Sequence, residues 1–139
     1  MKIVYDTLVC TTSEHTDIID ITREVEETVR SSGITNGTVL LFVSGSTAAL
    51  TTIEYESGVV SEHKNAIERI APHTMPYEHD RRWGDGNGYA HVRAALIGAS
   101  LTVPLREGTM LLGTWQQIVV LDFDNRPRKR ELQVQISGL

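Results

Sequence analysis

The sequence predicts an α+β protein in which short strands and helices are followed by a run of antiparallel strands. Residues 2–11 and 38–44 are filled with β-branched and apolar side chains, which is typical of strands, while residues 57–70 repeat their apolar positions at helical spacing. Two hairpin-like stretches follow within residues 100–137. A chain of 139 residues buries about two thirds of its unfolded surface, so we expect a single domain over residues 1–139.

The first third of the chain predicts two strands and a helix. Residues 2–11 are rich in Ile, Val, Tyr and Thr, which favour extended backbone, and residues 15–20 are expected to form a second short strand. An amphipathic helix of about three turns follows. We expect Thr22 to be its N-cap, because threonine accepts hydrogen bonds from free helical N–H groups, and Gly33 to be its C-cap.

The middle of the chain predicts a buried strand, a second strand and a second helix. Residues 38–44 form a continuous apolar run, and residues 48–56 resume the strand pattern. Glu54 and Glu56 would then lie on one face of this second strand, where they are either candidate bases or solvated carboxylates. The helix that follows is expected to end before Pro72.

The second half predicts a long loop, a short helix and two hairpins. Residues 73–88 are polar, and loops of that length in compact domains are usually functional or disordered. A helix is expected at about residues 89–98, and a first hairpin around Gly108. Residues 116–137 are expected to form a second hairpin. The predicted apolar stripe of the helix consists of Val92, Ala95, Leu96 and Ala99.

Composition excludes some classes of partner and location. The formal net charge of −5 argues against a general nucleic-acid binder, because such binding needs cations that displace counterions. No stretch approaches the apolar length of about 18 residues that a membrane span requires. Cys10 is the only cysteine and cannot form an internal disulfide. We therefore expect a cytoplasmic protein with neither nucleic acid nor membrane as a partner.

The stretch WGDGNGYAH, residues 83–91, is the strongest candidate for a ligand site. Its glycines permit left-handed backbone and close approach of the chain to a ligand, notably at Gly86 and Gly88. Asn87 or Gly88 can cap the helix that starts there, and free N–H groups at that end can hold a phosphate or a carboxylate. The alternative is a tight loop followed by an ordinary helix cap.

Two histidines and an aspartate surround this stretch. His91 is expected one turn into the helix at the border of its apolar stripe, a position that suits either a cleft or a hydrogen-bonded histidine at the core edge. His79, Asp85 and His91 are spaced six residues apart and can converge if the loop folds back. Imidazoles with a carboxylate suit zinc or another divalent ion, although this spacing matches no standard metal signature.

Four further residues are candidates for ligand contacts. Ser46 and Thr47 interrupt an apolar run, so they either bind an anion or mark a bulge. Gln116 lies between two predicted strands and can both donate to and accept from a polar ligand, unless it only forms a turn. Arg128 belongs to the basic stretch RPRKR, which either captures phosphate or is a solvated hairpin tip.

The order of these segments resembles the YjbQ family, whose small members are often labelled secondary thiamine-phosphate synthases. The resemblance rests on GSTAALTTIEYE, on YEHDRRWGDGNGYAHVRAALIGASLTVP and on GTWQQIVVLDFDNRPRKR, and it covers most of the chain. It implies a mostly antiparallel, sandwich-like α+β fold with two to three helices. It also implies a homotrimer with clefts between subunits, which agrees with strands more apolar than two short helices can cover.

The resemblance also carries a set of polar residues and one departure. The family's polar set falls on His79, Asp85, Asn87, His91 and Gln116. Many family members have a histidine where this chain has Gly45. If that histidine is a ligand or base elsewhere, another group must replace it here, and Glu54 or Glu56 are the candidates.

Two functions follow from the resemblance and the polar residues. The first is a transferase that joins hydroxymethylpyrimidine diphosphate to thiazole phosphate, with either a divalent metal, Mg²⁺ or Zn²⁺, or basic residues to neutralise the departing pyrophosphate. The second is a trimeric protein that binds a small anion or a metal without this turnover. For the transferase, the catalytic residues would be His91, Asp85 and Gln116. The phosphate-bearing ligand would contact Ser46, Thr47, Gly86, Asn87, Gly88 and Arg128, and a metal would bind to His79 and His91.

Overall fold

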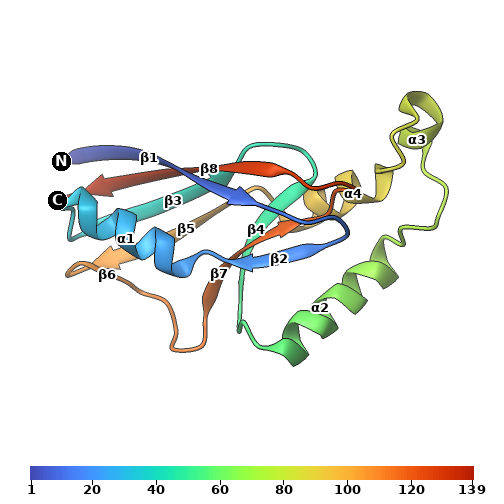
Figure 1. Cartoon of the computed structure of the whole chain (residues 1–139). Coiled ribbons are helices and arrows are strands. Elements are labelled where there is room, and N and C mark those ends of the chain that lie inside the picture. Colours follow the sequence, from blue (N-terminus) through green and yellow to red (C-terminus); the bar gives the residue numbers. More distant parts are fainter.

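The computed structural model describes residues 1–139 and contains two antiparallel sheets and four helices (Figure 1). This confirms the predicted α+β class. None of the four helices is both long and apolar enough to cross a membrane. The elements in chain order are β1 (Lys2–Thr11), β2 (Asp17–Asp20), α1 (Thr22–Ser32), β3 (Gly37–Val43), β4 (Ala48–Ile53), α2 (Ser57–Ile70), α3 (Glu78–Trp83), α4 (Gly88–Ile97), β5 (Ser100–Arg106), β6 (Thr109–Met110), β7 (Gln117–Asp122) and β8 (Lys129–Gly138).

The strands form a five-stranded sheet in the order β1-β8-β3-β5-β6 and a three-stranded sheet in the order β2-β7-β4. The hairpin predicted for residues 116–137 is therefore wrong, because β7 and β8 belong to different sheets. The two strands belong to different sheets because their side chains are buried in different patterns. Side chains on both faces of β7 are buried from Ile118 to Leu121, whereas β8 alternates between buried and exposed side chains. β7 is thus a middle strand covered on both sides, and β8 faces the core with one side only.

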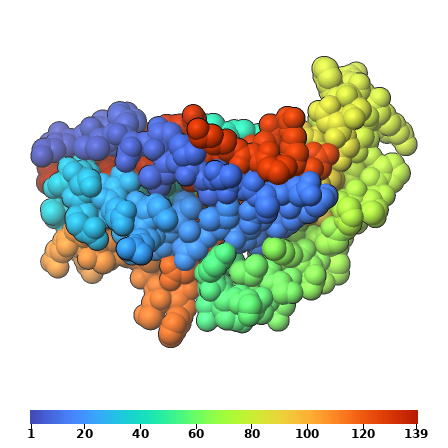
Figure 2. Space-filling model, viewed as in Figure 1, coloured from blue at the N-terminus to red at the C-terminus, as the bar shows by residue number.

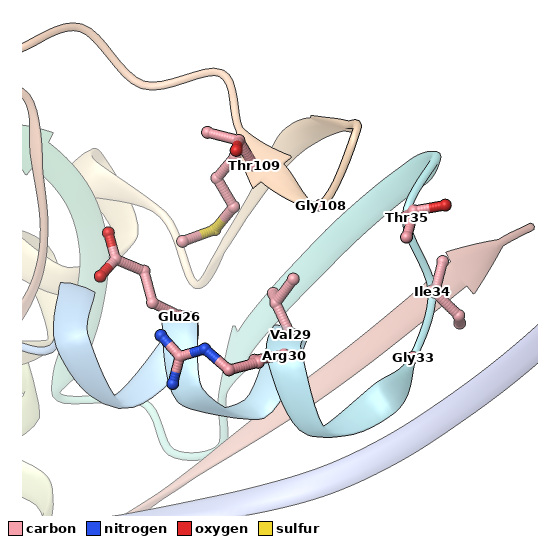
Figure 3. A pocket seen from close by; sticks show the side chains of 9 residues that line it. Glu26, Val29, Arg30, Gly33, Ile34, Thr35, Gly108 and Thr109 are labelled. Atoms are coloured by element: carbon pink, nitrogen blue, oxygen red, sulfur yellow. The ribbon is translucent and has the colours of Figure 1, made fainter.

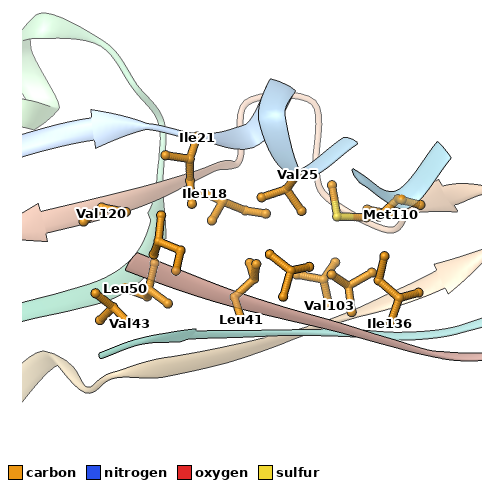
Figure 4. Packing of buried hydrophobic residues seen from close by; sticks show 14 of the residues in the cluster. Ile21, Val25, Leu41, Val43, Leu50, Val103, Met110, Ile118, Val120 and Ile136 are labelled. Carbon is orange, nitrogen blue, oxygen red and sulfur yellow. The ribbon is translucent and has the colours of Figure 1, made fainter. Parts of the chain in front are cut away.

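Two apolar clusters lie on opposite faces of the three-stranded sheet. The larger cluster joins the five-stranded sheet to α1, and Figure 4 shows Ile21 and Val25 facing Leu41, Val103 and Ile136. The smaller cluster packs the other face of the three-stranded sheet against side chains of α2 and α4. Helices α2, α3 and α4 gather at the end of the molecule away from both termini (Figure 1). The protein is therefore layered, with the small sheet in the middle.

Helix α1 confirms the predicted helix and its glycine cap, but its start differs. Gly33 adopts a left-handed conformation with φ of 72° and ends the helix as expected. Ile21, not Thr22, occupies the N-cap position, and the Asp20 carboxylate accepts from the first helical N–H, that of Thr22. The Thr22 hydroxyl instead donates to Asp20 and accepts from the Ile118 N–H, so it fastens the helix to β7.

The region between β4 and α4 corrects two expectations. Strand β4 ends at Ile53, so Glu54 and Glu56 do not share a strand face. The Glu56 carboxylate accepts from the N–H groups of Gly58 and Val59 and thereby caps α2, which leaves it unsuited to act as a base. Helix α2 ends before Pro72 as predicted, but residues 73–88 are not a continuous loop because they include α3.

The apolar stripe predicted for α4 faces outward. Val92 is 43% exposed and Leu96 is 60% exposed. The helix instead buries the face that carries Tyr89, Ala90, Arg93 and Ala94. Arg93 can be buried because Glu68 pairs with its guanidinium, which also lies over the Tyr89 ring. The buried ion pair of Arg93 and the small alanines therefore determine which face of α4 packs inward. The apolar side chains of Val92 and Leu96 remain on the surface.

Candidate functional site

A polar hollow lies where three segments meet at the helical end of the molecule. Residues 45–47 after β3 form one side, and His79 to His91 of the α3–α4 segment form another. Arg128, just before β8, and Arg130 within it complete the lining of a volume of about 500 Å³. Helix α3, drawn in yellow, projects from the body of the molecule beside it (Figure 2). Trp83 is the large apolar side chain at its rim and is 67% exposed.

The structure brings most of the predicted site residues together in this hollow. The predicted residues that line it are Ser46, Thr47, His79, Asp85, Asn87, His91 and Arg128. Gln116 does not join them. Its amide nitrogen donates to Thr52 at 3.0 Å and its oxygen accepts from the Gly113 N–H at 3.0 Å, so the side chain fastens the turn before β7.

The glycines of the GDGNG loop are required by the backbone conformation and by close packing. Gly84 and Gly86 have φ values of 72° and 70°, which favour glycine. A side-chain carbon at Gly88 would lie 2.6 Å from the Tyr77 Cβ. The expectation of a free N–H for phosphate at Gly88 is wrong, because this group donates to the Asp80 carboxylate at 2.8 Å. The protein's own carboxylate thus occupies the position predicted for an anion.

Buried ion pairs form the floor of the polar hollow. Arg130 donates to both carboxylate oxygens of Asp122, at 2.8 and 2.9 Å, and thereby links β8 of the large sheet to β7 of the small one. Arg128 donates to Asp124 at 2.8 Å, so the basic stretch RPRKR is not simply a solvated tip. Both cations are already compensated, and capture of phosphate by Arg128 would have to compete with Asp124.

Gly45 lies directly over this ionic floor. Its φ is 126°, and a side-chain carbon there would lie 2.8 Å from the Arg130 guanidinium. A larger residue would therefore be strained and would displace Arg130 from its carboxylate partner. The backbone conformation and the nearby Arg130 guanidinium together account for a glycine at this position.

Asn87 lines the hollow, and the buried Asp124 lies behind it as its hydrogen-bond partner. Asp124 is fully buried and accepts from the Asn87 amide at 3.2 Å and from the Thr47 hydroxyl at 3.1 Å. Burial alone would raise the pKa of Asp124, but hydrogen bonds from Asn87, Arg128 and the Asn125 N–H outweigh it and lower the pKa to about 2. Asn87 is 6% exposed, and its Oδ1 atom has no hydrogen-bond partner.

His79 and His91 face each other at the rim, with ring centroids 4.3 Å apart. Burial lowers the pKa of His91 and the neighbouring His79 lowers it further, although Asp124, Asp85 and Asp80 act in the opposite direction. His91 is therefore a neutral imidazole at pH 7. The Nδ1 atom of His79 is buried and makes no hydrogen bond, although the Asp80 carboxylate lies 3.5 Å from it. No three His, Cys, Asp or Glu side chains lie close enough to hold one metal ion together, so the histidine pair would need a ligand of another type.

Sequence reasoning missed the buried acids Asp122 and Asp124 and their partner Arg130. A signal for Arg130 existed in the two-residue period of β8, whose even-numbered side chains face the core. Arg130 falls on that inward face, and an inward arginine requires a buried carboxylate.

A second hollow lies between α1 and the β5–β6 hairpin and has a volume of about 370 Å³ (Figure 3). Its charged lining residues are Glu26 and Arg30, and none of the predicted site residues contributes to it. Two of the three buried side-chain polar atoms that lack a hydrogen-bond partner belong to the polar hollow instead, at His79 and Asn87. Buried unpaired polar atoms are uncommon, so the polar hollow is the stronger candidate.

We expect Asp124 to make the free energy of unfolding depend on pH in the acidic range. Its folded pKa of about 2 lies below the usual value of 3.8, so its contribution is present above about pH 4 and is lost as the pH falls towards 2. The contribution amounts to about 2 kcal/mol. Urea unfolding of the wild type and Asp124→Asn should therefore differ in free energy at pH 6 and differ less at pH 2.5. A difference that does not change with pH would contradict this role.

The comparisons with known proteins agree with one another. The family model described as UPF0047 protein YjbQ-like matches residues 6–139. A UPF0047 protein of Methanothermobacter thermautotrophicus is 38% identical over 99% of this chain and 94% of its own. The UPF0047 protein YugU of Bacillus subtilis is 36% identical over 95% of this chain and 98% of its own.

The fold is also similar to solved structures. A crystal structure of a YbjQ-like protein of unknown function from Sulfolobus solfataricus has a TM-score of 0.95 and 34% identity over 99% of both chains. A conserved protein of Clostridium acetobutylicum, described as YjbQ/UPF0047 family, has a TM-score of 0.87 and 32% identity over 95% of this chain and 99% of its own. A family model that spans almost the whole chain, with relatives of this similarity, establishes that the chain belongs to the YjbQ/UPF0047 family.

Proposed function

We propose that the polar hollow binds a small phosphate-bearing molecule with a divalent cation, for a transferase reaction of the thiamine-phosphate synthase type. In this reaction the methylene carbon of hydroxymethylpyrimidine diphosphate bonds to the nitrogen of thiazole phosphate, and pyrophosphate leaves. The observation that carries the proposal is the pair of unpartnered buried atoms, Asn87 Oδ1 and His79 Nδ1, in one hollow with His91. Each such atom costs about 1–3 kcal/mol, which a ligand would offset.

The hollow itself offers little uncompensated positive charge to a phosphate-bearing ligand. Arg128 and Arg130 are compensated by Asp124 and Asp122, so they add little net positive charge for a departing pyrophosphate. A divalent cation supplies that charge. Ser46 is an exposed hydroxyl on the lining and is available to a phosphate oxygen. The thiazole nitrogen that attacks carries no proton, so the role of His91, as a neutral imidazole, is to accept a hydrogen bond from the substrate and position it.

Replacement of His91 by alanine tests this role. We expect His91→Ala to lower the rate of thiamine phosphate formation by about 100-fold, because the loss of a contact that positions the substrate can cost that much. The melting temperature should change little, since His91 is only half-buried. The matched control is His63→Ala on α2, because His63 is also half-buried and also has an unpartnered Nδ1, but does not line the hollow.

The two variants separate the two interpretations of His91. Full activity in His63→Ala with loss in His91→Ala supports a role in the hollow. Intact activity in His91→Ala together with a large drop in melting temperature would instead identify a histidine that only packs at the core edge.

A second candidate function is binding of a small anion or a metal without turnover. The compensated charges of Arg128 and Arg130 favour it, because a site built for pyrophosphate departure ordinarily presents unpaired cations. A strict divalent-metal requirement for thiamine phosphate formation would support the transferase. Tight retention of pyrophosphate or metal, with no product formed from the two substrates, would support binding alone.

We also propose that the protein is a cytoplasmic homotrimer. Val92 and Leu96 on α4, and Ile3 and Tyr5 on β1, are exposed apolar side chains of the kind that subunit contacts cover. Cys10, the only cysteine, is buried and free, which suits a reducing compartment. Light scattering should give the mass of three chains, and Leu96→Glu should lower it because a charge would be buried at the contact. A monomer mass for the wild type across micromolar concentrations would reject the trimer.

A further inference from the structure

A third hollow, which we call the Arg93 hollow, lies between the β1–β2 turn, the C-terminal end of α2 and α4, and has a volume of about 320 Å³. Its lining residues are His15, Thr16, Glu68, His73, Tyr89 and Arg93. Tyr89 and Arg93 share the buried face of α4, whereas His91 falls on nearly the opposite face of the helix. No residue lines both this hollow and the polar hollow, so the two are separate.

The Arg93 guanidinium has more donor hydrogens than the protein has acceptors for. Arg93 is 3% exposed, and its Nε and Nη1 atoms donate to the Ala71 carbonyl oxygen and to Thr16 Oγ1, both at 2.9 Å. Its Nη2 atom donates to the Glu68 carboxylate. A guanidinium carries five N–H hydrogens, so two of them have no acceptor in the protein. The Thr16 hydroxyl accepts from Arg93, which leaves its own hydrogen as a third free donor.

Glu68 also fixes the imidazole of His73, which lines the same hollow. Its Oε1 atom accepts from the His73 N–H at 3.1 Å and lies 2.7 Å from the ring Nδ1. Burial alone would raise the pKa of Glu68, but hydrogen bonds from His73 and Arg93 outweigh it and lower the pKa. An ionised carboxylate only accepts hydrogen bonds, so the hydrogen of a neutral His73 ring lies on Nδ1. The Nε2 atom is then left as an acceptor.

The turn between β1 and β2 holds Thr16 in a strained conformation. His15 and Thr16 have φ values of 62° and 47°, which are uncommon for residues other than glycine and least favourable for β-branched ones. The N–H and hydroxyl of Ser13 hold the turn by donating to the Asp17 carboxylate at 2.8 and 3.0 Å. Backbone strain that neighbouring groups hold in place is typical of ligand-binding sites. Here it keeps the Thr16 hydroxyl in the lining of the hollow.

We propose that the Arg93 hollow binds a small hydroxycarboxylate, whose carboxylate accepts from Arg93 and Thr16 and whose hydroxyl donates to His73. A carboxylate offers the acceptor oxygens that the free guanidinium hydrogens lack. Glu68 already compensates the charge of Arg93, so a singly charged acid is favoured over a phosphate dianion, which Glu68 would repel more strongly. This site goes beyond the proposed function and does not depend on turnover in the polar hollow.

Glycolate and acetate test the proposal, because they differ only in the hydroxyl group. We expect glycolate to bind to the full chain with a Kd of about 1 mM, as suits so small a ligand. Acetate should bind about 5-fold more weakly, because it lacks one hydrogen bond. Nuclear magnetic resonance titration measures both constants, and the shifted resonances should include those of Thr16, His73 and Arg93. Absence of glycolate binding, equal affinity for the two acids, or shifts confined to the polar hollow would overturn the proposal.

Two variants assign the hydroxyl and carboxylate contacts. His73→Ala should reduce the ratio of glycolate to acetate affinity to about one and leave acetate binding unchanged, because it removes only the acceptor for the hydroxyl. Thr16→Val should weaken both acids by about 5-fold. The matched control is His63→Ala on α2, which lies outside the hollow and should keep the wild-type ratio.

The ratio of the two affinities also keeps the test independent of folding. A variant that is only partly folded loses the same factor for both acids, so the ratio within that variant is not affected. An unchanged ratio in His73→Ala would therefore overturn the hydroxyl contact even if the variant is unstable. Glycolate binding without thiamine phosphate formation would reject the transferase and leave this site standing.

Discussion

Replacement of Arg130 by methionine is expected to lower the free energy of unfolding by about 3–5 kcal/mol, because it leaves a buried charge without its partner. Asp122 is 1% exposed and receives two hydrogen bonds from the Arg130 guanidinium. Arg130 also donates to Thr47, so the substitution removes a contact under the polar hollow as well. Urea unfolding at pH 7 measures the loss.

An exposed ion pair provides the control for this substitution. Arg23 and Glu27 lie 3.5 Å apart on the surface of α1, with side chains 87% and 58% exposed. Arg23→Met should cost less than about 1 kcal/mol, as exposed pairs do. If Arg130→Met proves as mild as Arg23→Met, the link between the two sheets does not depend on this buried pair.

A second large effect is expected for Gly37→Ala, which should cost about 3 kcal/mol through overpacking. The added carbon would lie 1.9 Å from the Ser137 carbonyl oxygen. Gly37 pairs with Gly138 in the β3–β8 ladder and with Leu105 of β5, so backbone on both sides limits any shift of the strand. Thermal or urea unfolding of the variant would measure the loss.

Gly108→Ala separates crowding from backbone strain. Gly108 has a φ of 77°, but a side-chain carbon there would meet no atom within 4 Å. Its replacement should therefore cost only the strain of a left-handed conformation, about 1–2 kcal/mol. Equal losses for the two variants would show that close approach of β3 and β8 is not what requires Gly37.

Local patterns in the sequence predicted most elements but not how they pair. The strands, α1 and α2 follow from apolar periodicity and from signals such as Gly33 and Pro72. The separation of β7 and β8 depends on which strands lie beside them, and no short stretch of sequence encodes that. The buried face of α4 was missed for a similar reason. An apolar stripe outweighed Arg93 in the prediction, while its partner Glu68 lies 25 residues earlier.

The sequence predicted most of the residues that line the candidate site but not the buried acids beneath them. The polar residues of the α3–α4 segment stand out because glycine, asparagine and histidine gather there, and Asp85, Asn87 and His91 do line one hollow. Gln116 was included through its place in a familiar motif, but its side chain stabilises a distant turn. Asp122 and Asp124 were overlooked because they stand at the end of a predicted hairpin strand, where nothing in the local sequence indicates that both carboxylates are buried.

The central place of β8 has a consequence for biosynthesis. Strand β8 lies between β1 and β3, so neither of these earlier strands finds its shared neighbour until residues 129–138 have left the ribosome. Until then β1 has no partner strand and β3 is paired on one side only, by β5, so unpaired strand edges expose the nascent chain to aggregation. Arg130 arrives in the same segment, so the acids Asp122 and Asp124 are neutralised at the step that closes the large sheet. A ribosome that stalls before this segment therefore releases an open sheet without a formed site.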